Sequence, residues 1–248
     1  FCWKLKESNN CKRIFVAPGN AGTSKIASNL NVDVLNFDQV KISILKLDIN
    51  LVMVGPEIPL IEGIVDFINN DIDLKSVLVV GPSKAGAKLE GSKDFSKEFM
   101  VKHNIPTAKY ESFSSENLDK GLDYLQSISP PYVLKADGPA AGKGVLIVDN
   151  LNEAQKELTN MLKNNKFGPS GHNVVIEEFL DGIELSCFVL TDGTSYKILP
   201  YAKDYKRIGE GDKGLNTGGM GAISPVPFAN KEFLKKVEKR IIVPTING

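Results

Sequence analysis

A glycine-rich segment flanked by two lysines is the part of the sequence best suited to chemistry. The segment VLKADGPAAGKGVLIV runs from Val133 to Val148 and contains Lys135 and Lys143. Small residues let the backbone approach a ligand, and successive N–H groups form a nest for anions. A hydrogen bond from a charged donor contributes about 1.5 to 3 kcal/mol, so two lysines would add useful affinity for polyphosphate. The segment predicts a nucleotide-binding loop, although a solvated glycine-rich hairpin fits the isolated pattern equally well.

The spacing of this segment excludes a Walker A loop. Gly138 to Gly142 is one residue too short for G-x-x-x-x-G-K-[ST], and Gly144 stands where a hydroxyl should meet magnesium. A strand is expected after Lys143, whereas a P-loop requires a helix there. The sequence therefore argues against a P-loop kinase or GTPase.

A second segment supports the nucleotide interpretation. In VVIEEFLDGIELSCFVL an apolar strand ends at Glu177 and Glu178, and Glu184 lies on the next expected strand. A strand edge offers backbone N–H and C=O groups to adenine, apolar side chains would enclose the ring, and Glu184 would accept hydrogen bonds from ribose hydroxyls. Acidic residues beside a hairpin are more often solvated surface. The interpretation therefore depends on the glycine-rich loop as well.

Strands and helices alternate along the first part of the chain. Compact β-rich runs that close on glycine and proline lie at residues 13–19, 50–57 and 75–82. Apolar residues with helical spacing lie between them at 37–47 and 59–70. This order predicts an α/β fold with a parallel sheet and ligand loops at the carboxyl ends of its strands.

The second part of the chain changes to an α+β pattern. Amphipathic helices are predicted at 92–103, 114–127 and 151–164, the first with its lysines and acids opposite an apolar stripe. Further strands are predicted at 173–180, 184–190 and 195–202. The Asp-Gly pairs at 181–182 and 192–193 are predicted to close antiparallel hairpins between these strands.

Composition bounds the class of protein. The chain has 248 residues, and its 30 basic residues balance its 30 acidic ones, so no overall charge attracts nucleic acid or an anionic membrane. Its three cysteines are too few and too scattered for a disulfide framework or a zinc site, which suggests a reducing, cytoplasmic compartment. The longest apolar runs have strand length, and no signal peptide is visible. The single tryptophan, Trp3, is expected in the core.

Six motifs in order resemble the phosphoribosylamine–glycine ligase family of ATP-grasp enzymes. They are APGNAGT, VGPEIPLIEGIVDF, LEGSKDFSKEFMVKHNIPTA, KADGPAAGKGV, VVIEEFLDGIELS and LNTGGMGAISPVP. The resemblance is collinear over nearly the whole chain. It implies a Rossmann-like, substrate-binding α/β domain at residues 1–90, followed at 91–248 by an α+β ATP-grasp domain whose lid covers about 111–182.

The resemblance also implies a reaction. ATP, with Mg²⁺ or Mn²⁺, phosphorylates glycine, and the amine of 5-phosphoribosylamine attacks the glycyl phosphate to give glycinamide ribonucleotide, ADP and phosphate in de novo purine (IMP) biosynthesis. Positioning and charge neutralisation would supply most of the catalysis. Partners are these small molecules, with no nucleic acid and no membrane, and the family includes fusions to other purine-pathway domains. Two alternatives stay open: another ATP-grasp carboxylate–amine ligase, and a nucleotide-binding fragment without turnover.

Site residues are carried over by position. Lys93 and Lys135 resemble the pair that holds the α- and β-phosphates, and Lys143 and Arg207 are the candidate catalytic residues. The residues that resemble nucleotide contacts are Lys93, Lys135, Gly138, Ala141, Gly142, Lys143, Gly144, Glu177, Glu178, Phe179, Leu180 and Glu184. The residues that resemble substrate contacts are Gly19, Asn20, Ala21, Gly22, Thr23, Gly55, Pro56, Glu57, Asp204, Lys206, Asn216, Thr217, Gly218, Gly219, Met220 and Gly221.

The sequence departs from the family pattern at several points. Pro139 replaces a leucine and is expected to stiffen the loop, and Tyr205 replaces a histidine, which puts an imidazole role there in doubt. Both ends look truncated: a strand and glycine loop are expected before Phe1, and the glutamate and asparagine that bind the metal are expected beyond Gly248. Without these oxygen ligands the fragment is expected to fail in phosphoryl transfer.

Overall fold

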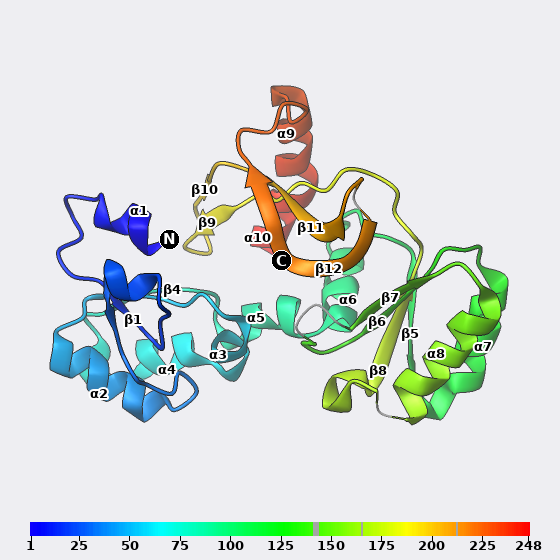
Figure 1. Cartoon of the computed structure of the whole chain (residues 1–248), viewed down its shortest axis with the longest axis horizontal. Helices are drawn as coiled ribbons and strands as arrows, with labels where there is room; N and C mark the ends of the chain where they lie inside the picture. Colours follow the sequence, from blue (N-terminus) through cyan, green and yellow to red (C-terminus); the bar gives the residue numbers. More distant parts are fainter. Residues whose placement is uncertain (141–143, 165, 212) are drawn as a thin grey trace. The chain divides into compact units, whose positions relative to one another are not determined.

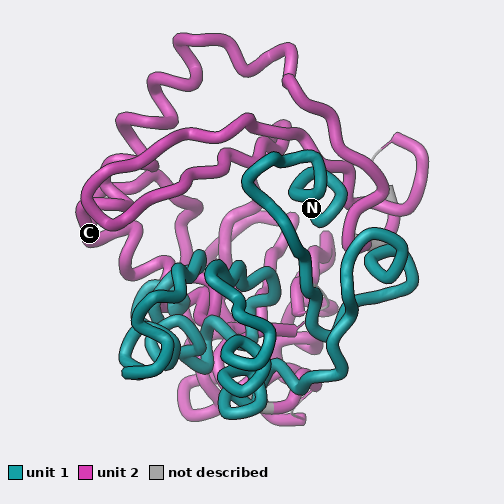
Figure 2. Tube along the Cα trace, turned by 90° about the vertical axis from the view of Figure 1, so that its left-hand side faces the viewer, with its two compact units in different colours: residues 1–88 teal, residues 89–248 magenta. Residues whose placement is uncertain are grey.

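The computed structural model describes the chain except for residues 141–143, 165 and 212. The described residues form two compact units, residues 1–88 and 89–248 (Figure 2). The sequence of each unit accounts for its own core.

Parallel strand pairs build the first unit. Strand β1 (Phe15–Val16) pairs with β2 (Ser28–Asn29), and β3 (Leu51–Met53) pairs with β4 (Leu78–Val80). The predicted parallel pairing is confirmed for β3 and β4, but the described residues form two separate two-stranded sheets instead of one. Strand β2 escaped prediction because its Ser-Asn pair carries no apolar run.

Helices connect and cover these strands. Helix α2 (Phe37–Leu47) has the predicted bounds, because the Asn36 side chain caps its first turn and Asp48 ends it in the left-handed region. The single helix predicted at 59–70 is instead α3 (Glu57–Glu62) and α4 (Ile64–Asn70). Gly63 separates them with φ 98°, a conformation that interrupts a helix. The core of the unit consists of Ile44, Ile64, Val65, Ile68 and Leu74.

The beginning of the chain differs from expectation. Helix α1 (Cys2–Lys6) buries none of its residues. Trp3 is 74% exposed, so its predicted place in the core was wrong. The remaining short helices near this unit are the 3-10 helices η1 (Thr23–Lys25) and η2 (Ile72–Leu74) and helix α5 (Lys84–Gly91).

An antiparallel sheet is the centre of the second unit (Figure 1). Its order is β5-β8-β6-β7, and the strands are β5 (Tyr110–Ser114), β8 (Asn173–Glu177), β6 (Tyr132–Ala136) and β7 (Val145–Val148). The predicted hairpin of β6 and β7 around the glycine-rich segment is confirmed, with Lys135 opposite Val145. The sheet therefore places both ends of that segment beside one another.

Two amphipathic helices, α7 (Leu118–Ser127) and α8 (Leu151–Lys163), pack against this sheet (Figure 1). Leu125, Leu134, Leu158 and Ile176 are fully buried between them and the strands. A Cβ at Gly121 in α7 would lie 3.0 Å from Leu158 Cδ2, so the glycine permits the close packing of helix and core. Helix α6 (Lys93–Lys102) begins at the cap residue Ser92, near the predicted start. Short 3-10 segments η3 (Ser115–Asn117) and η4 (Gly168–Gly171) complete this part.

Two further antiparallel ribbons follow. One pairs β9 (Val189–Thr191) with β10 (Tyr196–Ile198), and the other pairs β11 (Lys203–Gly209) with β12 (Lys213–Ile223). The predicted hairpin at Asp192–Gly193 is confirmed. The hairpin predicted at Asp181–Gly182 was wrong, because β8 pairs with β5 and β6 and the following segment joins another ribbon through a bridge from Ser186 to Ala202.

The chain ends in helices. Helix α9 (Lys231–Val237), a π-helical turn (Glu238–Ile242) and α10 (Val243–Asn247) follow β12. None of the helices in the described ranges is long and apolar enough to cross a membrane.

Candidate nucleotide site

The amino-terminal turn of α6 is fixed to the end of β6. Ser92 Oγ donates a hydrogen bond to the Asp137 carboxylate at 3.0 Å, and the Asp94 amide donates to Asp137 Oδ1 at 2.8 Å. Lys93 Nζ donates to the carbonyls of Asp137 and Gly138 at 3.2 and 3.3 Å. Asp137 thus places Lys93 directly beside the glycine-rich segment.

Adjacent strands place Lys135 next to Glu177. Val175 lies opposite Lys135 in the ladder between β6 and β8, and Glu177, two residues on, shares the same face of the sheet. Lys135 Nζ lies 3.0 Å from Glu177 Oε2, and Lys97 Nζ of α6 lies 3.0 Å from the same oxygen. The structure therefore brings Lys93, Lys97, Lys135 and Glu177 together from three elements.

Lys97 is not on the solvated face of its helix, where the amphipathic pattern predicts it. It is only 6% exposed, as buried as Glu177 at 5%. The spacing of the two lysines could have indicated its position. Residues four apart on a helix share a face, and Lys97 follows Lys93 by four residues.

Lys93 lies in an environment that disfavours its charge. Burial lowers the pKa of Lys93, and the neighbouring Lys135 lowers it further, while Asp137, Glu90 and Glu177 act in the opposite direction without compensating fully. An anion bound beside Lys93 would favour the protonated ammonium. The arrangement suits a polyphosphate better than an isolated, solvated pair of lysines would.

Close packing holds both ends of the glycine-rich segment. The Gly138 amide donates to the Ser170 carbonyl at 3.2 Å, and the Ala136 amide donates to the Gly144 carbonyl at 2.8 Å. A Cβ at Gly144 would lie 2.8 Å from the Cβ of Ala140, a distance that real side chains do not tolerate. Ala141, Gly142 and Lys143, the centre of the predicted loop, lie outside the described residues.

The residues predicted to contact adenine, 177–180, lie at the end of β8 and directly after it. The Glu178 amide donates to the Lys109 carbonyl at 2.9 Å, and Glu178 Oε1 accepts from the Lys109 amide at 3.0 Å. The Glu178 side chain is therefore engaged with the backbone immediately before β5. Phe179 is 39% and Leu180 is 65% exposed, so apolar surface lies next to these main-chain groups.

A second charged cluster includes the predicted ribose acceptor. Lys206 Nζ in β11 lies 3.3 Å from Glu184 Oε2 and 3.7 Å from Asp204 Oδ2. Burial lowers the pKa of Lys206, but Glu184 and Asp204 outweigh this and raise it overall. Lys206 therefore stays charged, and it holds the largely exposed Glu184 carboxylate in place.

The substrate motif in β12 does not form the loop that was expected at a strand end. Asn216 lies opposite Arg207 inside the ladder of β11 and β12, and Gly221 lies opposite Tyr205. Thr217 Oγ1 donates to the Lys206 carbonyl at 2.8 Å, whereas Gly218, Gly219 and Met220 are exposed. The expectation was wrong because β11, which carries no strong β pattern, pairs with Asn216 and with Gly221 to Ile223 on either side of a register shift across Thr217 to Met220.

The remaining substrate motifs lie in the first unit, directly after strands as predicted. Gly19 to Thr23 follows β1, and Asn20 Oδ1 accepts from the amides of Gly22 and Thr23 at 2.8 and 2.9 Å. The Asn20 side chain thus stabilises its own turn. Gly55 and Pro56 follow β3, and Glu57 begins α3.

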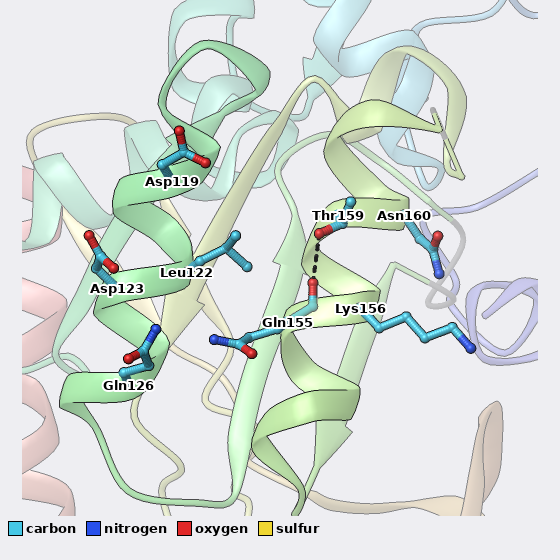
Figure 3. Close-up of a pocket in the computed structure, with 8 residues that line it drawn as sticks. All are labelled: Asp119, Leu122, Asp123, Gln126, Gln155, Lys156, Thr159 and Asn160. Atoms are coloured by element: carbon cyan, nitrogen blue, oxygen red, sulfur yellow. Dashed lines mark hydrogen bonds between the residues drawn. The ribbon is translucent and has the colours of Figure 1, made fainter.

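A separate groove of about 450 Å³ lies between α7 and α8 (Figure 3). Its lining consists of Asp119, Leu122, Asp123, Gln126, Gln155, Lys156, Thr159 and Asn160. Leu122 and Gln155 point into the space between the two helices, and none of the eight residues belongs to the predicted site. Within the described ranges, no group of three or more His, Cys, Asp or Glu residues is placed to hold a metal ion.

Family models match the whole chain. One described as the phosphoribosylglycinamide synthetase N domain matches residues 1–90, and one described as the ATP-grasp (A) domain of the same synthetase matches residues 91–248.

Individual proteins are similar over nearly the same range. The chain is 47% identical to the bifunctional purine biosynthetic protein PUR2,5 of Pichia angusta, covering 99% of this chain and 31% of that protein. It is 44% identical to a phosphoribosylamine–glycine ligase of Haemophilus influenzae, covering 99% and 56%. The crystal structure of such a ligase from Thermotoga maritima superposes with a TM-score of 0.78 at 32% identity, covering 99% of this chain and 57% of that one. The chain therefore spans from about a third to just over half of these relatives.

Proposed function

Because the chain belongs to the phosphoribosylglycinamide synthetase family, we propose that it forms the nucleotide-binding and substrate-binding part of a phosphoribosylamine–glycine ligase. The observation that carries the proposal is the position of two lysines at the glycine-rich segment: Lys93 Nζ donates to the Gly138 carbonyl where the segment begins, and Lys135 lies opposite Val145 where it ends. The three free cysteines, Cys2, Cys11 and Cys187, fit a reducing cytoplasm.

The nucleotide would bind along β6 and β8. We assign the α- and β-phosphates to Lys93 and Lys135, with the segment from Gly138 to Gly144 closing over them and Lys143 as the catalytic lysine. The close packing of Gly138 against Ser170 and of Gly144 against Ala140 supports this, because it fixes both ends of a segment whose small residues let the backbone approach an anion. We assign adenine to main-chain groups of residues 177–180, since the Glu178 side chain already bonds to Lys109.

The other substrates would bind through the remaining motifs. We assign ribose of the nucleotide to Glu184, and the phosphoribosyl substrate to residues 19–23, 55–57 and 216–221 together with Asp204, Lys206 and Arg207. Arg207 would stabilise developing negative charge as a catalytic residue. Residues 1–90 would thus act as the substrate-binding domain, and residues 111–182 would form the lid of the ATP-grasp domain. Fusion to another purine-pathway domain would be compatible with this assignment.

The reaction explains why a closed, charged site is required. A glycine carboxylate oxygen attacks the γ-phosphorus, the bond to the β-phosphate oxygen breaks, and ADP leaves with the electron pair. The amine of 5-phosphoribosylamine then attacks the glycyl carbon, the carbon–oxygen bond to phosphate breaks, and the amine releases a proton. The lysines would neutralise the phosphates and hold the reactants together, because water would otherwise hydrolyse the acyl phosphate.

The described residues suit a nucleotide but provide no ligand set for a metal ion. The partly exposed ammonium groups of Lys93 and Lys135, beside a glycine-rich segment, suit the triphosphate of ATP. A divalent cation, Mg²⁺ or Mn²⁺ in our proposal, requires a set of oxygen ligands. The described residues contain no cluster of three or more acidic, histidine or cysteine side chains for it, so we derive no step through the metal.

The proposal is tested with the native full-length protein, supplied with ATP, glycine and 5-phosphoribosylamine. Equal amounts of glycinamide ribonucleotide, ADP and phosphate, identified by mass spectrometry, are the expected result. Turnover with a different carboxylic acid or amine, but not with this pair, would instead identify another ATP-grasp ligase. ATP binding without any release of phosphate would reject the ligase activity.

The assignment of Glu184 to ribose makes a separate prediction. Glu184→Ala should weaken ATP binding by about tenfold but weaken 2′-deoxy-ATP binding much less, because a charged acceptor is lost only where a 2′-hydroxyl donates to it. Calorimetric titration with both nucleotides measures the difference. Asp181→Ala, which removes an exposed carboxylate from the same loop, is the matched control. Equal losses for the two nucleotides would rule out the ribose contact.

A further inference from the structure

Lys97 is a buried cation to which neither the motifs nor the proposed reaction gives a role. Its ammonium lies 3.0 Å from Glu177 Oε2 and donates to Thr107 Oγ1 at 2.8 Å and to the Ala108 carbonyl at 3.3 Å. Its Nζ also lies 5.4 Å from the centre of the Tyr110 ring. These contacts surround the ammonium, so it can reach a ligand only through Glu177.

Glu177 serves two cations at once. Lys97 and Lys135 both lie 3.0 Å from the same oxygen, Oε2, but they differ in exposure: 7% of the Lys97 side chain is exposed and 28% of the Lys135 side chain. The three groups carry one formal positive charge in excess. Because Lys97 is enclosed, the part of this charge that a ligand can contact lies on Lys135.

We propose that Lys97 is a positioning residue that neutralises Glu177, so that Lys135 presents an unbalanced positive charge to a polyphosphate. The inference rests on the proposed nucleotide site and deepens it. Without Lys97, Glu177 and Lys135 would form a one-to-one ion pair with no net charge, and a phosphate would have to compete with the carboxylate for the ammonium. Glu177 would also repel the phosphate across a poorly screened interior.

The position of Lys93 fits this role. The pKa of Lys93 is lowered chiefly by burial, and it responds to both Lys135 and Glu177, which places these charges within range of the same ligand site. With Lys97 present, the ammonium groups of Lys93 and Lys135 lie beside a Glu177 carboxylate whose charge is already neutralised. With Lys97 absent, the same two ammonium groups would share their charge with Glu177.

The test compares ADP with adenosine by calorimetric titration of the protein. Lys97→Met keeps most of the length of the side chain but removes its charge. It should weaken ADP binding about tenfold while adenosine binding changes less than twofold. Lys97→Arg should keep ADP within about threefold of the unaltered protein. The double variant Lys97→Met with Glu177→Gln should recover most of the lost ADP affinity, because no carboxylate is left to neutralise.

The controls separate positioning from folding. Lys102→Met removes an exposed lysine from the last turn of the same helix and should leave both ligands unchanged. A purely structural Lys97 would weaken ADP and adenosine together, and the added Glu177→Gln would restore neither; either result would overturn the proposal. If the unaltered protein binds adenosine but gains nothing from phosphates, the assignment of the phosphate site fails. If it binds ADP tightly and Lys97→Met does not weaken it, only the role of Lys97 fails.

Discussion

Replacing Lys135 with methionine should weaken ADP binding by about 10- to 100-fold while leaving adenosine binding within about twofold. The physical reason is the loss of a charge-assisted hydrogen bond to a phosphate, which contributes about 1.5 to 3 kcal/mol, where 1.4 kcal/mol corresponds to a factor of ten. The variant should remain folded, because Glu177 keeps Lys97 as a partner at 3.0 Å and is not left as an unpaired buried charge.

Calorimetric titration with ADP and adenosine checks this expectation. Lys120→Met, which removes an exposed lysine from α7, is the matched control and should bind both ligands like the unaltered protein. An ADP affinity that stays within twofold in Lys135→Met would show that the phosphates lie elsewhere. The same result would remove the basis for the roles of Lys93 and of the glycine-rich segment.

Local patterns predicted the elements that carry this site. The bounds of α2 and the start of α6 follow from cap residues, Asn36 and Ser92, that act on their own first turns. The hairpin of β6 and β7 follows from two apolar runs on either side of a glycine-rich segment. These features are readable because the groups that determine them lie within a few residues of each other.

Contacts between residues of different elements could not be predicted from local sequence patterns. Nothing in the helical pattern of α6 shows that Lys97 meets Glu177, 80 positions further along the chain, and a lysine on a helix is normally solvated. Likewise, the glycines around Asn216 indicate a loop, but β11 pairs with Asn216 and Gly221 at the two ends of the motif and makes it part of a strand with a register shift. In both cases the deciding partner belongs to another element of the structure, which a local pattern does not show.

The second prediction concerns how much the core between α7, α8 and the sheet contributes to the free energy of unfolding. Leu158 of α8 is fully buried against α7 and the sheet, and its Cδ2 fills the space above Gly121 of α7. Leu158→Ala should lower the free energy of unfolding of the second unit by about 3 to 5 kcal/mol, because apolar burial is lost and a cavity remains. Leu158→Met, which conserves volume, should cost less than about 1.5 kcal/mol.

Intrinsic probes allow this loss to be assigned to one unit. All six tyrosines lie between residues 110 and 205, in the second unit, whereas the single tryptophan, Trp3, lies in the first. Urea unfolding followed by tyrosine circular dichroism should therefore shift to lower urea in Leu158→Ala. Trp3 is 74% exposed and belongs to no core, so its signal should not change with this substitution. A tyrosine transition that is unchanged would mean that Leu158 does not support this core. We expect the transition to shift while the affinity for ADP at low temperature is retained. Helices α7 and α8 would then stabilise the sheet without contacting the nucleotide. The positions of Lys93, Lys135 and Glu177 predict this division of roles.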